Sequence, residues 1–112
     1  MVLIIGGAYQ GKLCFATEQF HMAENDPRIW RGYHLSVLEQ LQNSVDPLED
    51  LRNQIPSLKD RVIICDDIFC GVVPEDPTMR LWRETLGRCL VALSQKADEV
   101  YRVFCGLGMR LK

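Results

Sequence analysis

The first thirteen residues constrain the fold of this chain more than any other segment. An apolar run, Met1 to Ile5, leads directly into Gly6-Gly7, and Gly11-Lys12 follows three residues later. Such a run before G-x-x-x-x-G-K predicts a short buried strand, a tight turn and a helix that begins near Lys12. Glycines let the backbone come close to an anion, and successive N–H groups with the positive helix end then form a concave anion site. The segment therefore predicts a phosphate-binding loop.

The whole loop is expected to contact the phosphates of a nucleotide, through Gly6, Gly7, Ala8, Tyr9, Gln10, Gly11, Lys12 and Leu13. Lys12 would reach the outer phosphates, which makes it the candidate catalytic residue. One position departs from the pattern, because the Ser or Thr whose hydroxyl binds the magnesium ion of the nucleotide is replaced by Leu13. Two interpretations stay open: a loop that still binds phosphate, and an inherited turn that only packs.

Composition narrows the class of protein. The 112 residues predict one domain, residues 1–112, with 47% apolar and 25% charged residues. A net charge of −2 argues against a broad nucleic-acid or membrane surface, and no apolar run approaches the ~20 residues of a membrane span. Met1 to Ile5 lacks the basic flank of a signal peptide, so a cytoplasmic location is expected.

The cysteine pattern indicates a reduced protein. Five cysteines without a C-x-x-C pair argue against both a disulfide framework and a zinc site. Four of them lie in apolar surroundings and are expected to be small buried side chains: Cys14, Cys65, Cys89 and Cys105.

Strand and helix patterns alternate along the rest of the chain. After the first strand they predict helices at 12–22, 35–42, 47–55 and 79–97, and strands at 61–65, 99–105 and 109–112. This order predicts an α/β fold, a small P-loop NTPase-like three-layer domain with a mostly parallel sheet of three or four strands. Ligands bind such sheets at the carboxyl ends of the strands. The glycine loop, the pair Asp66-Asp67 and the turn at 106–108 should therefore converge.

Three further groups are candidates for the chemistry. Asp66 and Asp67 end an apolar strand, where phosphate-loop enzymes hold a metal with a carboxylate; the alternative is a solvated turn. Three arginines lie on the long predicted helix and could either bind phosphates or form ordinary surface ion pairs: Arg80, Arg83 and Arg88. His34 is a candidate nucleophile, although a lone histidine is more often structural.

With these residues in view, the chain resembles the adenosylcobinamide kinase / adenosylcobinamide-phosphate guanylyltransferase family of cobalamin biosynthesis. The likeness is strongest in three segments of the C-terminal half: residues 66–76 with Gly71-Val72-Val73-Pro74, residues 80–88 with their arginines, and residues 97–103 with Gly106. The glycine loop at the start also matches, through Gly6-Gly7-Ala8 and Gly11-Lys12. The departures include Leu13 for the family's serine, Asp67 and Phe69 in the acidic loop, and Leu90 for an asparagine. The middle of the chain is also much shorter than in the full-length enzyme.

The resemblance implies phosphoryl transfer from ATP or GTP, with Mg²⁺, to the hydroxyl of adenosylcobinamide. It implies a nucleotide and a corrinoid as ligands, and a homo-oligomer such as a trimer. Guanylyl transfer is not expected, because the segment that carries the family's guanylylated histidine has no clear match. A second hypothesis stays open: a degenerate, non-catalytic paralogue that binds nucleotide weakly or serves in assembly.

Overall fold

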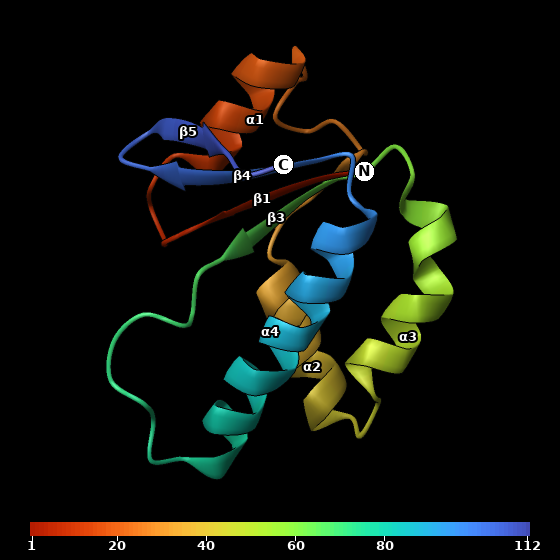
Figure 1. Cartoon of the computed structure of the whole chain (residues 1–112), viewed down its shortest axis with the longest axis vertical. Helices are drawn as coiled ribbons and strands as arrows, with labels where there is room; N and C mark the ends of the chain where they lie inside the picture. The colour runs from red at the N-terminus through yellow and green to blue at the C-terminus, as the bar shows by residue number, and fades with distance from the viewer.

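The computed structural model describes the whole chain, residues 1–112, as a sheet with helices on both faces (Figure 1). The elements follow in the order β1 (Val2–Gly6), α1 (Lys12–Phe20), β2 (Ile29–Trp30), α2 (Tyr33–Gln42), α3 (Pro47–Gln54), the 3₁₀ turn η1 (Ile55–Leu58), β3 (Val62–Asp66), α4 (Pro77–Lys96), β4 (Glu99–Phe104) and β5 (Leu107–Arg110). The expected α/β fold is confirmed.

The sheet has five strands in the order β2-β3-β1-β4-β5. The first four run parallel, and β5 returns antiparallel to β4 as the second half of a hairpin. The predicted number of strands, three or four, was too small because β2 has only two residues, too few for a periodic signal. The expected terminal strand begins two residues earlier than predicted, at Leu107.

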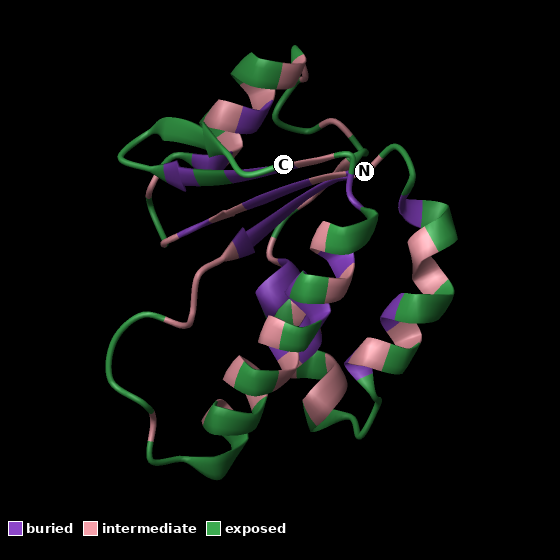
Figure 2. Cartoon of the chain, viewed as in Figure 1, coloured by how far each residue is buried: buried purple, intermediate pink, exposed green.

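Alternate side chains of the central strands fill two separate cores, one on each face of the sheet. Leu3 and Ile63 pack with α2, α3 and α4, whereas Ile4 and Ile64 pack with α1. Figure 1 shows this arrangement, with α1 on one side of the sheet and the other three helices opposite. The buried residues follow the inner faces of these elements (Figure 2). A parallel sheet covered on both faces accounts for the unbroken apolar run of β3.

Helix boundaries follow the capping residues. Asp46 and Asp76 accept hydrogen bonds from backbone N–H groups in the first turns of α3 and α4, which explains why these helices begin at Pro47 and Pro77. By contrast, α1 and α2 begin after Gly11 and Gly32, which have positive φ angles and no capping side chain. Their first N–H groups are thus left without a side-chain partner.

The cysteine prediction was wrong for two of the four positions. Cys65 and Cys89 are buried as expected, but Cys14 and Cys105 are exposed. Cys14 lies in α1, which packs on the sheet along one side only, and Cys105 forms the β4–β5 turn with a φ of 51°. Apolar neighbours in the sequence do not determine burial at a helix surface or a turn.

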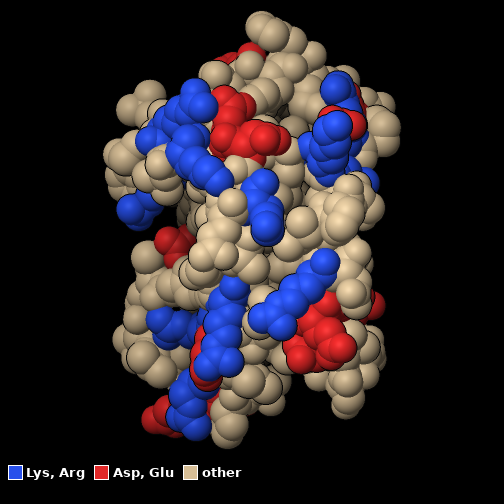
Figure 3. Space-filling model, turned by 45° about the vertical axis from the view of Figure 1, so that its right-hand side comes forward, with Lys and Arg blue, Asp and Glu red and all other residues tan.

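No helix of the structure is both long and apolar enough to cross a membrane. Figure 3 shows basic and acidic side chains interspersed on one face, without a broad patch of one sign.

Candidate functional site

The glycine loop follows β1 at the carboxyl edge of the sheet and opens α1. Gly11 takes a φ of 87° as the residue before the helix, a conformation that other residues rarely adopt. At the loop tip, Tyr9 also has a positive φ, 60°, and its side chain is fully exposed. The β4–β5 turn holds the loop from one side, because Gln10 accepts hydrogen bonds from the N–H groups of Cys105 at its side chain (2.7 Å) and of Gly106 at its carbonyl (2.8 Å).

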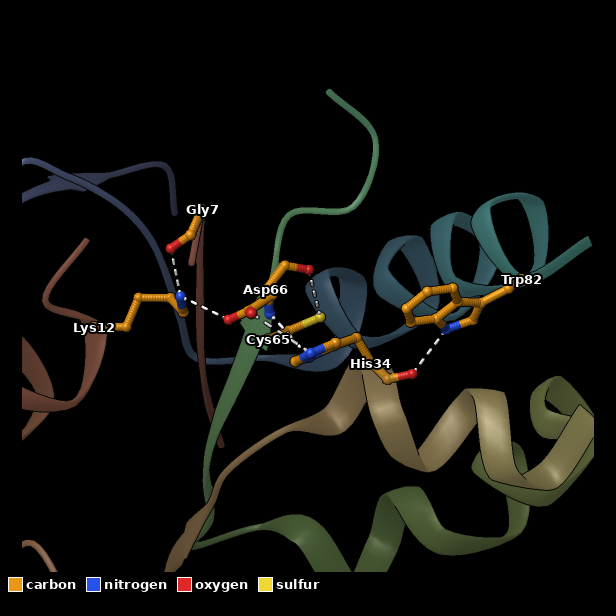
Figure 4. A network of polar contacts seen from close by, with 6 residues as sticks. All are labelled: Gly7, Lys12, His34, Cys65, Asp66 and Trp82. Carbon is orange, nitrogen blue, oxygen red and sulfur yellow. Dashed lines mark hydrogen bonds and ion pairs between the residues drawn. The ribbon is translucent and has the colours of Figure 1, made fainter. Parts of the chain in front are cut away.

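Lys12 lies inside this loop and is only 7% exposed. Its Nζ donates to the carbonyl oxygen of Gly7 at 2.6 Å and lies 2.8 Å from Oδ1 of Asp66 (Figure 4). Asp66 is the last residue of β3 and pairs in register with Gly6 of β1. The predicted meeting of the loop, the acidic pair and the C-terminal turn is therefore confirmed in the geometry.

The two aspartates have different surroundings. Asp66 faces Lys12, whereas Asp67 turns to its own loop and accepts hydrogen bonds from the Phe69 N–H (2.9 Å) and the Cys70 thiol (3.4 Å). Only Asp66 lines the pocket beside the glycine loop. Of the predicted pair, one carboxylate is in the site and the other organises the β3–α4 connection.

His34 lies beside Asp66, an arrangement that its position in the sequence did not predict. The Asp66 N–H donates to Nδ1 of His34 at 3.1 Å, and Nε2 lies 3.5 Å from Oδ2 of the same residue (Figure 4). Trp82 donates through Nε1 to the His34 carbonyl at 2.8 Å and stacks on the imidazole with ring centroids 6.2 Å apart.

Burial lowers the pKa of His34 below its ordinary value, the Asp66 carboxylate acts in the opposite direction, and Lys12 lowers it further. The ring is thus neutral near pH 7, and because Nδ1 accepts a hydrogen bond, its proton lies on Nε2. Both ring nitrogens of His34 are engaged with Asp66. This geometry favours a positioning role for His34 over the nucleophile considered from the sequence.

The structure does not bring the predicted arginines to the loop. Arg83 binds the carbonyl oxygens of Phe69 (2.5 Å) and Val72 (3.2 Å), and Arg88 pairs with Glu84 at 2.6 Å on the helix surface. Arg80 is exposed. None of the three lines the pocket beside the loop.

That pocket has an open volume of about 550 Å³. The glycine loop forms one wall, and the start of α2 forms the other with Arg31, Gly32 and Leu35. The second wall was not predicted from the sequence. The available signal was Gly32, which interrupts an apolar stretch directly before a helix and therefore marked a turn.

The residues present do not fit a magnesium ion held by the protein. Leu13 supplies no oxygen ligand, and Oδ1 of the Asp66 carboxylate is already paired with Lys12, while its Oδ2 lies 3.5 Å from His34 Nε2. No cluster of three or more His, Cys, Asp or Glu side chains lies together elsewhere in the structure. In nucleotide sites Mg²⁺ is held by one or two protein oxygens together with phosphate oxygens and water. Here the position of the hydroxyl ligand is Leu13, and the single carboxylate that lines the pocket is paired with Lys12.

Comparison with known proteins places the chain in a family. A family model described as "Cobinamide kinase / cobinamide phosphate guanyltransferase" matches residues 28–111, a range that begins after the glycine loop. The chain is also 28% identical over 89 residues to the bifunctional adenosylcobalamin biosynthesis protein CobU of Salmonella typhimurium. This match covers 80% of the chain and 47% of the relative, so the chain spans about half the length of that protein. Because the family model matches most of the chain, this protein belongs to the cobinamide kinase / cobinamide phosphate guanyltransferase family.

Proposed function

We propose that the chain binds the phosphates of ATP or GTP in the loop from Gly6 to Leu13 and transfers a phosphoryl group to a hydroxyl of adenosylcobinamide. The observation that carries the proposal is the position of Lys12. Lys12 is only 7% exposed and lies in the glycine loop at the carboxyl edge of a parallel sheet, so its ammonium group is suited to an incoming anion. Its present partners, Gly7 and Asp66, are groups that outer phosphate oxygens can replace.

Phosphoryl transfer depends mainly on positioning and on stabilising charge. In the proposed reaction, the bond between the γ-phosphorus and the bridging oxygen breaks, and a bond to the acceptor oxygen forms. The hydroxyl proton is released, and a nucleoside diphosphate leaves. Lys12 and the first N–H groups of α1 would stabilise the negative charge on the phosphates.

Guanylyl transfer through a histidine is not part of the proposal. Both ring nitrogens of His34 contact Asp66, and His21 lies at the far end of α1 from the loop. A nucleophilic imidazole needs a nitrogen lone pair that can reach the nucleotide.

The test measures binding and transfer together. Calorimetry with ATP and with GTP should show micromolar affinity that is lost in Lys12→Ala, and radioactive phosphate should pass from labelled nucleotide to adenosylcobinamide. Lys96→Ala is the matched control, because Lys96 is exposed on α4 and forms no ion pair. Binding without transfer would support the non-catalytic alternative, and no binding up to millimolar nucleotide would overturn the proposal.

We also propose that the chain forms a homo-oligomer through the β4–β5 edge. β5 pairs with β4 alone, and this edge exposes Phe104, Leu107 and Met109. Exposed apolar edge strands favour pairing with another chain. Light scattering coupled to size exclusion should give a multiple of 12.9 kDa that Leu107→Lys reduces, whereas a monomer would contradict this part of the proposal.

A further inference from the structure

The pocket beside the glycine loop has a cationic side chain on each wall. Lys12 lies in the loop wall, and Arg31 lies in the opposite wall, directly before Gly32 and α2. The only carboxylate that lines the pocket is Asp66, which is paired with Lys12 at 2.8 Å. An anion that entered between the walls would meet both cations.

Arg31 has no partner of its own. Most other arginines are committed: Arg28 binds Asp26 through two side-chain contacts, Arg110 pairs with Glu99, and Arg61 lies over the Trp30 ring. Arg31 is exposed, lines the pocket and forms neither an ion pair nor a hydrogen bond. A guanidinium group can bind two phosphate oxygens at once, and no carboxylate competes for this one.

The loop lacks the means to hold a metal beside the phosphates. Leu13 replaces the hydroxyl ligand, and Oδ1 of the one carboxylate in the pocket, that of Asp66, is paired with Lys12 at 2.8 Å. The negative charge of a triphosphate must then be balanced by the side chains that line the pocket. Lys12 and Arg31 are the two that carry positive charge there.

We infer that Arg31 is a phosphate ligand that takes the place of the metal, so that this site binds the polyphosphate chain of a nucleotide without Mg²⁺. The inference rests on the proposed nucleotide site and specifies how its charge is balanced. Because Mg²⁺ and the protein's cations compete for the same phosphate oxygens, Mg²⁺ should leave the affinity unchanged or lower it. A site that holds the metal would show the opposite dependence.

The experiment titrates the full chain with ATP and with inorganic triphosphate, in EDTA and in excess Mg²⁺. The variants are Arg31→Ala, Arg31→Lys and, as a matched control, Arg52→Ala, since Arg52 is exposed on α3 and does not line the pocket. Thermal unfolding of each variant checks that the fold is intact, which is expected because both arginines are exposed.

The inference predicts that both ligands bind in EDTA at least as tightly as in Mg²⁺. Arg31→Ala should weaken binding roughly 10- to 100-fold, as expected for loss of a charged hydrogen-bonding partner. Arg31→Lys should keep part of the parental affinity, and the control Arg52→Ala should keep all of it. Tenfold tighter binding in Mg²⁺, or parental affinity in Arg31→Ala while Lys12→Ala fails to bind, would overturn the inference and leave the proposed function standing. If neither ligand binds the parent chain, the proposed function fails and the inference with it.

Discussion

Replacing Asp66 with Asn should weaken the fold and strengthen phosphate binding at once. The carboxylate of Asp66 lies 2.8 Å from Lys12 Nζ, and the lysine side chain is 7% exposed while that of Asp66 is 31% exposed. The substitution keeps the size of the side chain and one acceptor oxygen, but it removes the negative charge. Lys12 would then hold a buried positive charge with only neutral oxygens as partners.

The size of the loss follows from the ion-pair attraction between Lys12 and Asp66, which depends on how deeply the pair is buried. The Lys12 ammonium keeps a charge-assisted hydrogen bond to the amide oxygen, so only the ion-pair attraction is lost. Exposed ion pairs contribute about 0–1 kcal/mol, and for this partly buried pair the loss should be about 1–2 kcal/mol. Complete removal of one partner of a fully buried pair costs about 3–5 kcal/mol, an upper limit here because Asp66 is partly exposed. For a chain of this size the expected fall in Tm is roughly 3–12 °C.

Phosphate affinity should change in the opposite direction. In the parent chain an incoming phosphate must displace the Asp66 carboxylate from Lys12, and in Asp66→Asn this competition is weaker. Calorimetry with ATP in EDTA should therefore show tighter binding, while thermal unfolding shows a lower Tm.

The neighbouring Asp67→Asn is the matched control. Asp67 contacts the Phe69 N–H and the Cys70 thiol instead of Lys12, so its loss should leave ATP affinity unchanged. The reasoning is refuted if Asp66→Asn is as stable as the parent, or if it binds ATP more weakly while Asp67→Asn does not. The second result, measured in EDTA, would indicate that the Asp66 carboxylate holds Lys12 in the position that binds phosphate instead of competing with the phosphate for it.

Three further predictions concern stability. Gly87→Ala should stabilise the chain by roughly 0.5–1 kcal/mol in urea unfolding, because a Cβ there would lie 3.6 Å from Phe69 and the helix gains propensity; a loss would show that the glycine is sterically required. Gly6→Ala should lower the yield of folded protein in circular dichroism, because the new Cβ would overlap the Val103 carbonyl oxygen; a native spectrum and Tm would contradict this. Because the folded pKa of His34 is depressed, the unfolded chain binds more protons as the pH falls below about 6.5, so stability should drop from pH 7 to pH 5; His34→Gln should flatten this dependence, and an unchanged slope would argue against it.

The sequence was most informative where local pattern determines structure. The loop could be predicted because an apolar run, glycines and Lys12 occur at fixed spacing, and the N-cap Asp46 before Pro47 predicted the start of α3. The convergence of the loop with residues 66–67 and 106–108 followed from the parallel sheet, since all three lie at its carboxyl edge.

Contacts between distant residues could not be predicted in this way. Which of Asp66 and Asp67 faces Lys12 depends on where β3 ends and on the direction of each side chain. His34 meets Asp66 from 32 positions away, through the packing of α2 on the sheet. Arg31 lines the pocket beside the loop because it directly follows the two-residue strand β2, and a strand this short has no periodic signal.

Nucleotide binding by the glycine loop is tested most directly by mapping the bound nucleotide on the chain. At 12.9 kDa the protein suits amide NMR, and ATP can be added stepwise to labelled protein. We expect shifts concentrated at residues 7–13 and 31–32, the two walls of the pocket, and their loss in Lys12→Ala. Shifts confined to other surfaces, or a spectrum unchanged at millimolar ATP, would contradict the claim that this loop binds a nucleotide.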